Sequence, residues 1–425
     1  MSPPSPSSAP PRTAALVFIF VTVLLDVLAL GLIIPVLPGI VAGFLQGDTA
    51  RTAEILGLFA TVWAVMHFFA SPVLGALSDR FGRRPLVLLS NFGLGLDYIL
   101  MALAPGLGWL FVGRVISGVT SASISTANAY IADVTPPEKR AASFGLLGAA
   151  FGVGFVLGPS LGGLLGSIDI HLPFWTAAGL SLANALYGLF VLPESLPPER
   201  RMPFVWKSAN PVGSLLFLRS LPSVLGLTVI YFLFNLSLNA LYSVFVLHGN
   251  HRYGWDERTV GLTMGLAGVL SLIVQGGLVR PVVRHLGERR TLVLGLVLVT
   301  VGLIGFGFAS AGWMFWAMQP FMALSGVFGP AAQGLMTRRV PASQQGQFQG
   351  ALAGVVSLTG IIGPALFTQV FALAIDPARG WNLPGAPFLL SAGLMLICLS
   401  LCRWSLRERD DATRPPEEDS IGRAA

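Results

Sequence analysis

Apolar stretches long enough to cross a lipid bilayer recur along almost the whole chain, and short polar loops separate them. Hydrophobic residues make up 54% of the chain and charged residues only 11%, whereas about a quarter of a soluble domain is charged. A spanning helix needs about 20 apolar residues. The sequence predicts twelve such helices, at residues 14–38, 54–77, 86–104, 108–133, 141–166, 173–192, 221–247, 258–285, 291–310, 312–338, 346–374 and 385–406.

The positive charges are distributed by membrane side. One set of alternate loops and the C-terminal tail hold most of the lysines and arginines, whereas the opposite loops hold Arg51, Arg252, Arg258 and Arg379. Cytoplasmic loops carry the excess of such residues, so we expect both termini and the central loop in the cytoplasm. The net charge of +6 therefore reflects orientation in a membrane, and we expect no nucleic-acid partner.

The chain repeats itself at a spacing of about 205 residues. Gly363-Pro364 repeats Gly158-Pro159, and Arg284–Arg290 repeats Asp79–Arg84 in a degraded form. Two six-helix halves around a central site of alternating access follow from this repeat. The predicted parts are a disordered N-terminus (1–13), an N-terminal bundle (14–192), a central loop (193–220), a C-terminal bundle (221–406) and a tail (407–425).

The turn at residues 75–84, here called the signature loop, joins two of the predicted spans. Its sequence is Gly-Ala-Leu-Ser-Asp-Arg-Phe-Gly-Arg-Arg, and its marked positions are Gly75, Asp79, Arg80, Gly82, Arg83 and Arg84. This run resembles the loop between helices 2 and 3 of the major facilitator superfamily. The resemblance implies an all-α integral membrane protein with twelve transmembrane helices in two pseudo-symmetric halves.

Few charged residues lie deep inside the apolar spans. Asp26, Asp97 and Arg114 do so, all in the N-terminal half. A charge at the centre of a spanning helix costs about 2.5–3.5 kcal/mol on insertion scales, so each needs a reason. They are either proton-coupling groups or a static ion pair that locks three helices together.

The fifth predicted span is dense in glycine. Its spacing resembles the fifth-helix motif of proton-driven antiporters, which distinguishes exporters from sugar symporters. The resemblance implies export. The motif residues are Gly145, Gly154, Gly158, Pro159, Gly162 and Gly163.

Neutral polar and aromatic residues also occur inside the spans. Each could merely hydrogen-bond a neighbouring helix, but together they suit a cavity for a large amphipathic solute. The candidate substrate-binding residues are His67, Asn235, Asn239, Trp316 and Gln319.

Longer segments narrow the resemblance to the bacterial tetracycline exporters. They include Gly113–Val119, Tyr130–Thr135, Phe144–Gly152, Gln344–Gly350 and Gly360–Thr368. The resemblance implies that Asp26, Asp97 and Arg114 serve proton-coupled transport. It further implies that Asp79, Arg83 and Asp133 hold a cytoplasmic gate, and that His67, Asn235 and Asn239 face the substrate path.

One departure concerns the substrate. Those exporters hold an acid in the ninth span and a histidine in the eighth, where this chain has Val299 and Ser271. A carboxylate there would help to attract a positively charged metal–tetracycline chelate. We expect no cofactor beyond the proton gradient, although the substrate can carry magnesium. A multidrug exporter that does not recognise tetracycline is the first alternative.

Two other classes compete with drug efflux. A symporter importing a sugar or organic acid would need no glycine motif in helix 5, and an intramembrane enzyme or scaffold would need a nucleophile–base pair or metal ligands. The sequence contains neither a P-loop nor an HExxH motif. We therefore expect a transporter, not an enzyme. It would be a monomer in the lipid bilayer of the bacterial inner membrane, and its partners would be protons and a small drug.

Overall fold

The computed structural model describes residues 12–121, 123–135, 140–202, 218–341 and 344–412, and within them it contains helices and no strand. The predicted all-α class is confirmed. The first half contains α1 (Arg12–Ile33), α2 (Leu37–Phe44), α3 (Thr49–Phe81), α4 (Arg83–Ala102), α5 (Leu107–Thr120), α6 (Ser123–Val134), α7 (Arg140–Gly166) and α8 (Leu172–Val191). The second half contains α10 (Pro222–Tyr253), α11 (Glu257–Ile273), α12 (Val279–Phe308), α13 (Gly312–Leu324), α14 (Phe328–Thr337), α15 (Gln345–Ile375) and α16 (Ala386–Ala412).

The helix boundaries differ from the hydropathy prediction at two places, one beside a proline and one at a glycine. The predicted span at 14–38 is divided into α1 and α2 by a turn that contains Pro35, because proline has no backbone donor. Conversely, α12 runs through the predicted loop between the eighth and ninth spans. Only Gly287 departs from helical geometry there, with φ 75° and ψ 161°. A π-helical turn, η5 (Val274–Leu278), joins α11 to α12.

The helices are long and apolar enough to cross a membrane. Among the described residues, eight segments meet this condition, and the shorter apolar helices Leu107–Thr120 and Ala386–Cys402 add to them. One of the eight, Glu257–Phe308, is 52 residues long and breaks at Gly287. With α13 and α14 as a further span, the arrangement is consistent with the twelve predicted helices.

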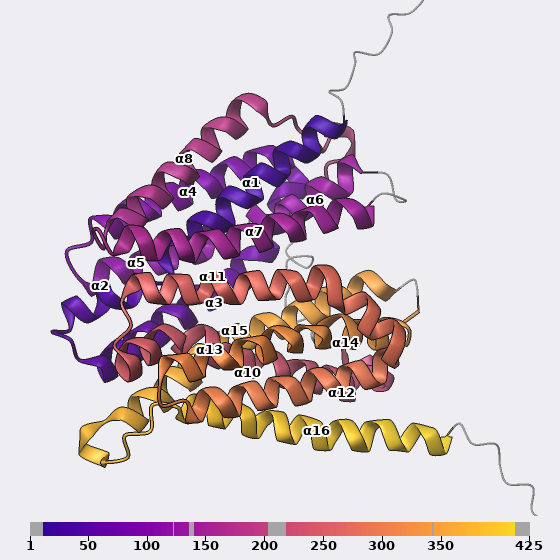
Figure 1. The fold of residues 1–425 in the computed structure, drawn as a ribbon. Coiled ribbons are helices and arrows are strands. Elements are labelled where there is room, and N and C mark those ends of the chain that lie inside the picture. The colour runs from indigo at the N-terminus through magenta and orange to yellow at the C-terminus, as the bar shows by residue number, and fades with distance from the viewer. Residues whose placement is uncertain (1–11, 122, 136–139, 203–217, 342–343, 413–425) are drawn as a thin grey trace, which may run out of the picture.

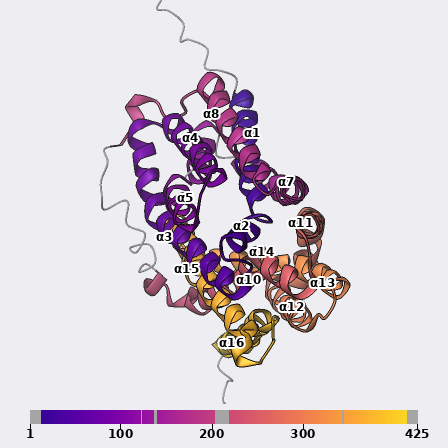
Figure 2. The ribbon, with the colours of Figure 1, turned by 90° about the vertical axis from the view of Figure 1, so that its left-hand side faces the viewer.

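Each half has its own hydrophobic core. Buried residues of α10, α12, α15 and α16 form a core in the second half. The first half has two smaller cores, one around Tyr98 and Phe174 and one around Phe18 and Tyr130. The halves meet along two helix pairs, α3 with α15 and α7 with α11. Figures 1 and 2 both show these pairs side by side.

Glycines and one hydrogen bond mark where the paired helices approach each other. A Cβ added at Gly163 of α7 would lie 3.0 Å from the Cα of Gly261. In the other pair, the Thr61 hydroxyl donates to the carbonyl oxygen of Ile361 at 3.3 Å. Nearer the signature loop, a Cβ added at Gly75, Gly148, Gly276, Gly277 or Gly350 would meet no atom within 4 Å. Contact between α7 and α11 extends from Gly163 as far as Gly152, where an added Cβ would lie 2.5 Å from Leu272.

Parts of the predicted central loop and of both predicted terminal segments lie outside the described residues. Of the central loop, residues 193–202 and 218–220 are described, whereas 203–217 lie outside the described residues. Residues 1–11 and 413–425, which make up most of the predicted terminal segments, also lie outside them. The last helix, α16, continues to Ala412, beyond the predicted end of the bundle at 406.

Candidate functional site

Asp26 lies on the face of α1 that packs against α8, within reach of one side chain of α4. The amide nitrogen of Asn184 on α8 donates to its Oδ1 at 2.9 Å. The Asn91 amide on α4 satisfies its hydrogen bonds when its nitrogen faces Asp26. In this orientation it donates to the two carboxylate oxygens at 3.1 and 3.2 Å. Asp26 is only 7% exposed, so the two amides replace water around a buried carboxylate. The sequence analysis missed both asparagines, although each is a polar residue in an apolar span.

Asp97 and Arg114 form a second buried polar pair between α4 and α5. Arg114 Nη2 lies 3.9 Å from Asp97 Oδ2, and the exposed fractions of the side chains are 12% and 0%. Both carboxylate oxygens of Asp97 are buried without a hydrogen-bond partner. The attraction between the two charges therefore offsets only part of the free-energy cost of removing them from water. The structure thus brings Asp97 to Arg114, while Asp26 occupies a separate asparagine-lined site.

Arg83 is the centre of the signature-loop cluster. Its guanidinium lies 2.6 Å from Asp79 and 3.1 Å from Asp133, and it donates to the Ser78 hydroxyl at 2.6 Å. The predicted trio of Asp79, Arg83 and Asp133 is therefore in contact. It links the end of α3 and the start of α4 to the end of α6.

Glu194, which the sequence analysis did not single out, also holds this loop. Its carboxylate accepts hydrogen bonds from the backbone amides of Arg83 at 2.8 Å and Arg84 at 3.3 Å. These are the first amides of α4, where a negative charge also complements the helix dipole. A Cβ at Gly82 would lie 2.7 Å from the carboxyl carbon of Glu194. Glycine is thus needed at 82 for space as well as for its φ of 107°.

The other residues of the signature loop have different surroundings. Arg84 donates to the carbonyl oxygen of Leu189 at 2.5 Å, and the Arg80 guanidinium lies 5.1 Å from the ring centre of Phe81. The carbonyl oxygen of Gly75 accepts from the Ser78 hydroxyl at 2.9 Å. Arg84 therefore fastens the loop to α8, whereas Arg80 stays at the surface.

The glycines of α7 pack against two different helices. A Cβ at Gly154 would lie 2.9 Å from Val27, and one at Gly158 would lie 2.8 Å from the Cα of Gly31; both neighbours belong to α1. An added Cβ at Gly162 would overlap Leu32, also on α1. Gly163 instead faces α11 of the other half, and Pro159 lies inside the helix. Gly145 belongs to α7, but its surroundings lie outside what the structure describes.

The predicted substrate-binding residues lie in three neighbourhoods, on α3, α10 and α13. His67 stacks on Trp63 of its own helix, α3, with ring centres 5.2 Å apart. The Asn239 amide donates to the carbonyl oxygen of Asn235 at 2.9 Å and toward Thr359 of α15 at 3.5 Å. The Asn235 amide donates to the carbonyl oxygen of Tyr231 at 2.8 Å. The Trp316 indole donates to Thr263 of α11 at 3.0 Å. Gln319, on the same helix as Trp316, is 4% exposed. Among the described residues, these contacts join Asn235 to Asn239 but do not link the three neighbourhoods to one another.

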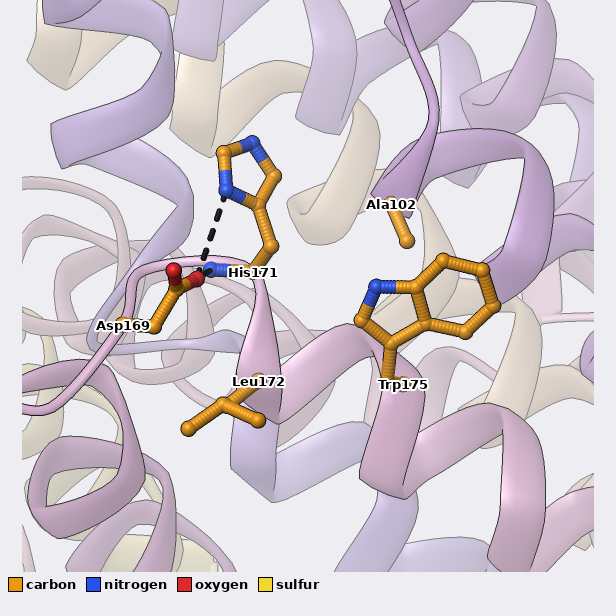
Figure 3. A pocket seen from close by; sticks show the side chains of 5 residues that line it. All are labelled: Ala102, Asp169, His171, Leu172 and Trp175. Carbon is orange, nitrogen blue, oxygen red and sulfur yellow. Dashed lines mark hydrogen bonds and ion pairs between the residues drawn. The ribbon is translucent and has the colours of Figure 1, made fainter.

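A cavity of about 450 Å³ lies away from all of these groups. Figure 3 shows its lining residues, where Asp169 and His171 precede α8 and the Trp175 ring lies near Ala102. Asp169 and His171 are themselves paired at 3.5 Å. No predicted site residue lines this cavity. Among the described residues, no group of three or more His, Cys, Asp or Glu side chains could hold a metal ion.

Comparison with known proteins identifies the family. The sequence matches the profile of the Major Facilitator Superfamily over residues 19–364 and 278–424. It is 39% identical to "Tetracycline resistance protein, class C" of Escherichia coli, across 92% of this chain and 98% of that protein. It is 34% identical to the class E protein of the same organism, across 92% and 94%.

Solved structures share the fold. The crystal structure of the human organic anion transporter MFSD10 (TETRAN) superposes with a TM-score of 0.68 at 23% identity, covering 93% of this chain and 100% of that one. A bacterial homolog of the human lysosomal transporter Spinster gives a TM-score of 0.72 at 16% identity, covering 96% and 100%. The chain is therefore a membrane transporter rather than an enzyme, and it belongs to the major facilitator superfamily together with the tetracycline resistance proteins.

Proposed function

We propose that this protein exports tetracycline, or a drug of similar amphipathic character, across the bacterial inner membrane in exchange for protons. Relatives that are 32–39% identical over about nine-tenths of the chain carry the name tetracycline resistance protein. The glycine contacts of α7 with α1 and α11 favour the antiporter interpretation of its motif. The signature loop would face the cytoplasm, with both termini on the same side.

The observation that carries proton coupling is the arrangement of Asp97. Its carboxylate is buried, lacks hydrogen-bond partners and lies 3.9 Å from a single cation, Arg114. Binding a proton would remove a charge that the surroundings stabilise poorly, and losing it would restore the attraction to Arg114. A second proton-binding carboxylate, Asp26, would be held in place by Asn91 and Asn184.

Transport would then follow from movement of the halves. The side that carries the signature loop would be the cytoplasmic one, from which the drug would enter. Opening and closing of that side would change how α3 packs on α15 and how α7 packs on α11. Each inward proton supplies about 2.3 kcal/mol per 100 mV of membrane potential, enough for a drug gradient of some tens-fold.

The drug path would combine the two halves. His67 and Trp63 offer a stacked aromatic surface on α3, and Trp316, at 45% exposure, offers another on α13. Asn235 and Asn239 would add hydrogen bonds from α10. A tetracycline would enter either free or as its magnesium chelate, and the protein itself would need no cofactor.

The test is drug uptake into proteoliposomes or inverted vesicles with an imposed pH gradient. We expect wild-type protein to accumulate tetracycline, and Asp97→Asn and Asp26→Asn to abolish accumulation while preserving folded protein. Asp169→Asn is the matched control, because Asp169 is exposed and lies outside the membrane core. Undiminished pH-driven uptake by both membrane variants would refute proton coupling through these acids.

A multidrug exporter that rejects tetracycline is the second candidate. The observation in its favour is the absence of an acid from residues 291–310. Val299, the position aligned with the acid of other exporters, is fully buried in the core of the second half. The same vesicles, tested with a drug panel with and without magnesium, distinguish the two. Uptake of monocationic drugs but not of tetracycline would favour the second candidate.

A further inference from the structure

Glu257, the first residue of α11, reaches from the second half of the molecule into the first. A Cβ added at Gly166, the last residue of α7, would lie 3.6 Å from the Cβ and 3.7 Å from the Cγ of Glu257. A Cβ added at Gly39 of α2 would lie 3.2 Å from Glu257 Oε1. The side chain therefore extends past the end of α7, and its carboxylate lies beside α2. We call this arrangement the Glu257 contact.

The Glu257 contact lies at the end of the molecule opposite the signature loop. The short helix α2 closely precedes α3, which is 33 residues long and has the signature loop at its other end. The backbone of α11 is also packed tightly here, because a Cβ added at Gly163 would overlap the carbonyl oxygen of Glu257. Both the side chain and the main chain of Glu257 thus join the two halves at this end, which we call the far side.

The first turn of α2 is suited to a negative charge from outside the helix. Its N-cap residue, Val36, makes no side-chain capping hydrogen bond, and its first turn contains no acidic residue. Free backbone N–H groups give the N-terminus of a helix a partial positive charge. Gly39 belongs to this first turn, and its missing side chain leaves room for the carboxylate of Glu257. Glu257 therefore supplies from the other half the charge that α2 itself lacks.

Ion pairs among the described residues do not account for the position of Glu257. None of them includes its carboxylate, which is half-buried. The first-half segments that face it, residues 34–44 and 156–166, contain no charged residue. The charged residues that follow α7, Asp169 and His171, are paired with each other at 3.5 Å. The start of α2 is thus the group in the first half that complements this carboxylate.

We propose that Glu257 is a positioning residue that holds the far side closed, through the attraction between its carboxylate and the first turn of α2. The contact forms when the halves meet on the far side, and it breaks when they part to release the drug. This inference rests on the two-sided access of the proposed transport function. It gives a role to an acid of the second half, whose predicted ninth span contains none.

The experiment measures how often the far side opens. Ser160 of α7 lies against α11, with its hydroxyl oxygen 3.5 Å from the carbonyl oxygen of Gly261. After Ser160→Cys, a membrane-impermeant maleimide added outside right-side-out vesicles can reach this position only when the halves part. The native Cys398 and Cys402 are buried in the core of the second half. The labelling rate therefore reports the open population of the far side.

The comparison is made between variants that carry Ser160→Cys. Glu257→Gln keeps the shape and removes the charge, so it should raise the labelling rate by about two- to five-fold, the effect expected of one charge at a helix end. Added salt should speed labelling when Glu257 is present but not in the Gln variant, because salt screens this attraction. Arg258→Gln is the matched control, since Arg258 is an exposed charge at the next position, and it should leave the rate unchanged.

The labelling rates decide the inference without any drug. An unchanged rate for Glu257→Gln would overturn it, and so would a lower rate, because the carboxylate would then oppose closure. An increase of the same size for Arg258→Gln, or an equal salt effect with and without the carboxylate, would also overturn it. Absence of pH-driven uptake by the wild-type protein would instead refute the proposed function.

Discussion

Replacing Gly82 by alanine tests whether Glu194 holds the signature loop. An added Cβ would lie 2.7 Å from the carboxyl carbon of Glu194, in a backbone conformation of φ 107° and ψ 159°. The substitution therefore combines two costs. One is strain in the backbone, and the other is displacement of the carboxylate from the amides of Arg83 and Arg84.

Gly287 separates these two costs. It has a similar conformation, with φ 75° and ψ 161°, but a Cβ added there would meet nothing within 4 Å. Strain of this kind costs about 1–3 kcal/mol, and we expect Gly287→Ala to lose that amount. Gly82→Ala should lose more, because a hydrogen bond to a charged group contributes about 1.5–3 kcal/mol. Since Glu194 is half-buried, we expect an excess near the lower end of that range.

The assay measures the free energy of unfolding in mixed micelles. Helicity is recorded as the mole fraction of dodecyl sulfate is raised. In a Glu194→Ala background the carboxylate is gone, so Gly82→Ala should then cost no more than Gly287→Ala. Equal costs for the two glycine substitutions in the wild-type background would refute the role assigned to Glu194. So would an excess at Gly82 that persists without the carboxylate.

Three further predictions concern the helix contacts and one cap. Gly163→Ala should block drug uptake, because the added methyl group would force α7 away from α11. Gly148→Ala, where an added Cβ would meet no atom within 4 Å, should leave uptake normal. Equal uptake by the two variants would contradict this prediction. Asn184→Ala removes a 2.9 Å hydrogen bond to Asp26, a loss of about 1.5–3 kcal/mol, and pH-driven uptake should fall at least about tenfold. Hydrogen bonds from Thr259 hold the pKa of Asp256 below its ordinary 3.8. Asp256→Ala should therefore lower the melting temperature at pH 7, and the difference should vanish as the pH falls through the lowered pKa; a difference that persists in acid would argue against the cap.

Hydropathy and motif spacing were sufficient to predict the fold class and the family. A span of about 20 apolar residues has few alternatives to a membrane helix, and the signature loop and the α7 glycines are local patterns. The trio of Asp79, Arg83 and Asp133 was also predictable, through resemblance. The same resemblance suggested His67, Asn235 and Asn239 as neighbours of one path, which remains a prediction.

Which partners the buried charges choose was decided only by tertiary structure. Asp26 and Asp97 look alike in the sequence, each a single acid in an apolar span, yet one faces two asparagines and the other an arginine. That difference depends on how α1, α4, α5 and α8 rotate against one another. Helix rotation is set by side-chain packing over the whole interface, which no local pattern records.

Glu194 and the ion pair of Glu288 with Arg338 show the same limit for the loops. Their sequences give charges at unremarkable positions, and the repeat of Arg83 by Glu288 even looks like a loss of the motif. Only the folded chain brings Glu194 back across more than a hundred residues to the start of α4, and Glu288 to Arg338. The sequence thus determined which segments lie in the membrane, since burial of apolar residues needs no partner. Packing determined which charges meet, because an ion pair or hydrogen bond exists only once two distant segments have been placed.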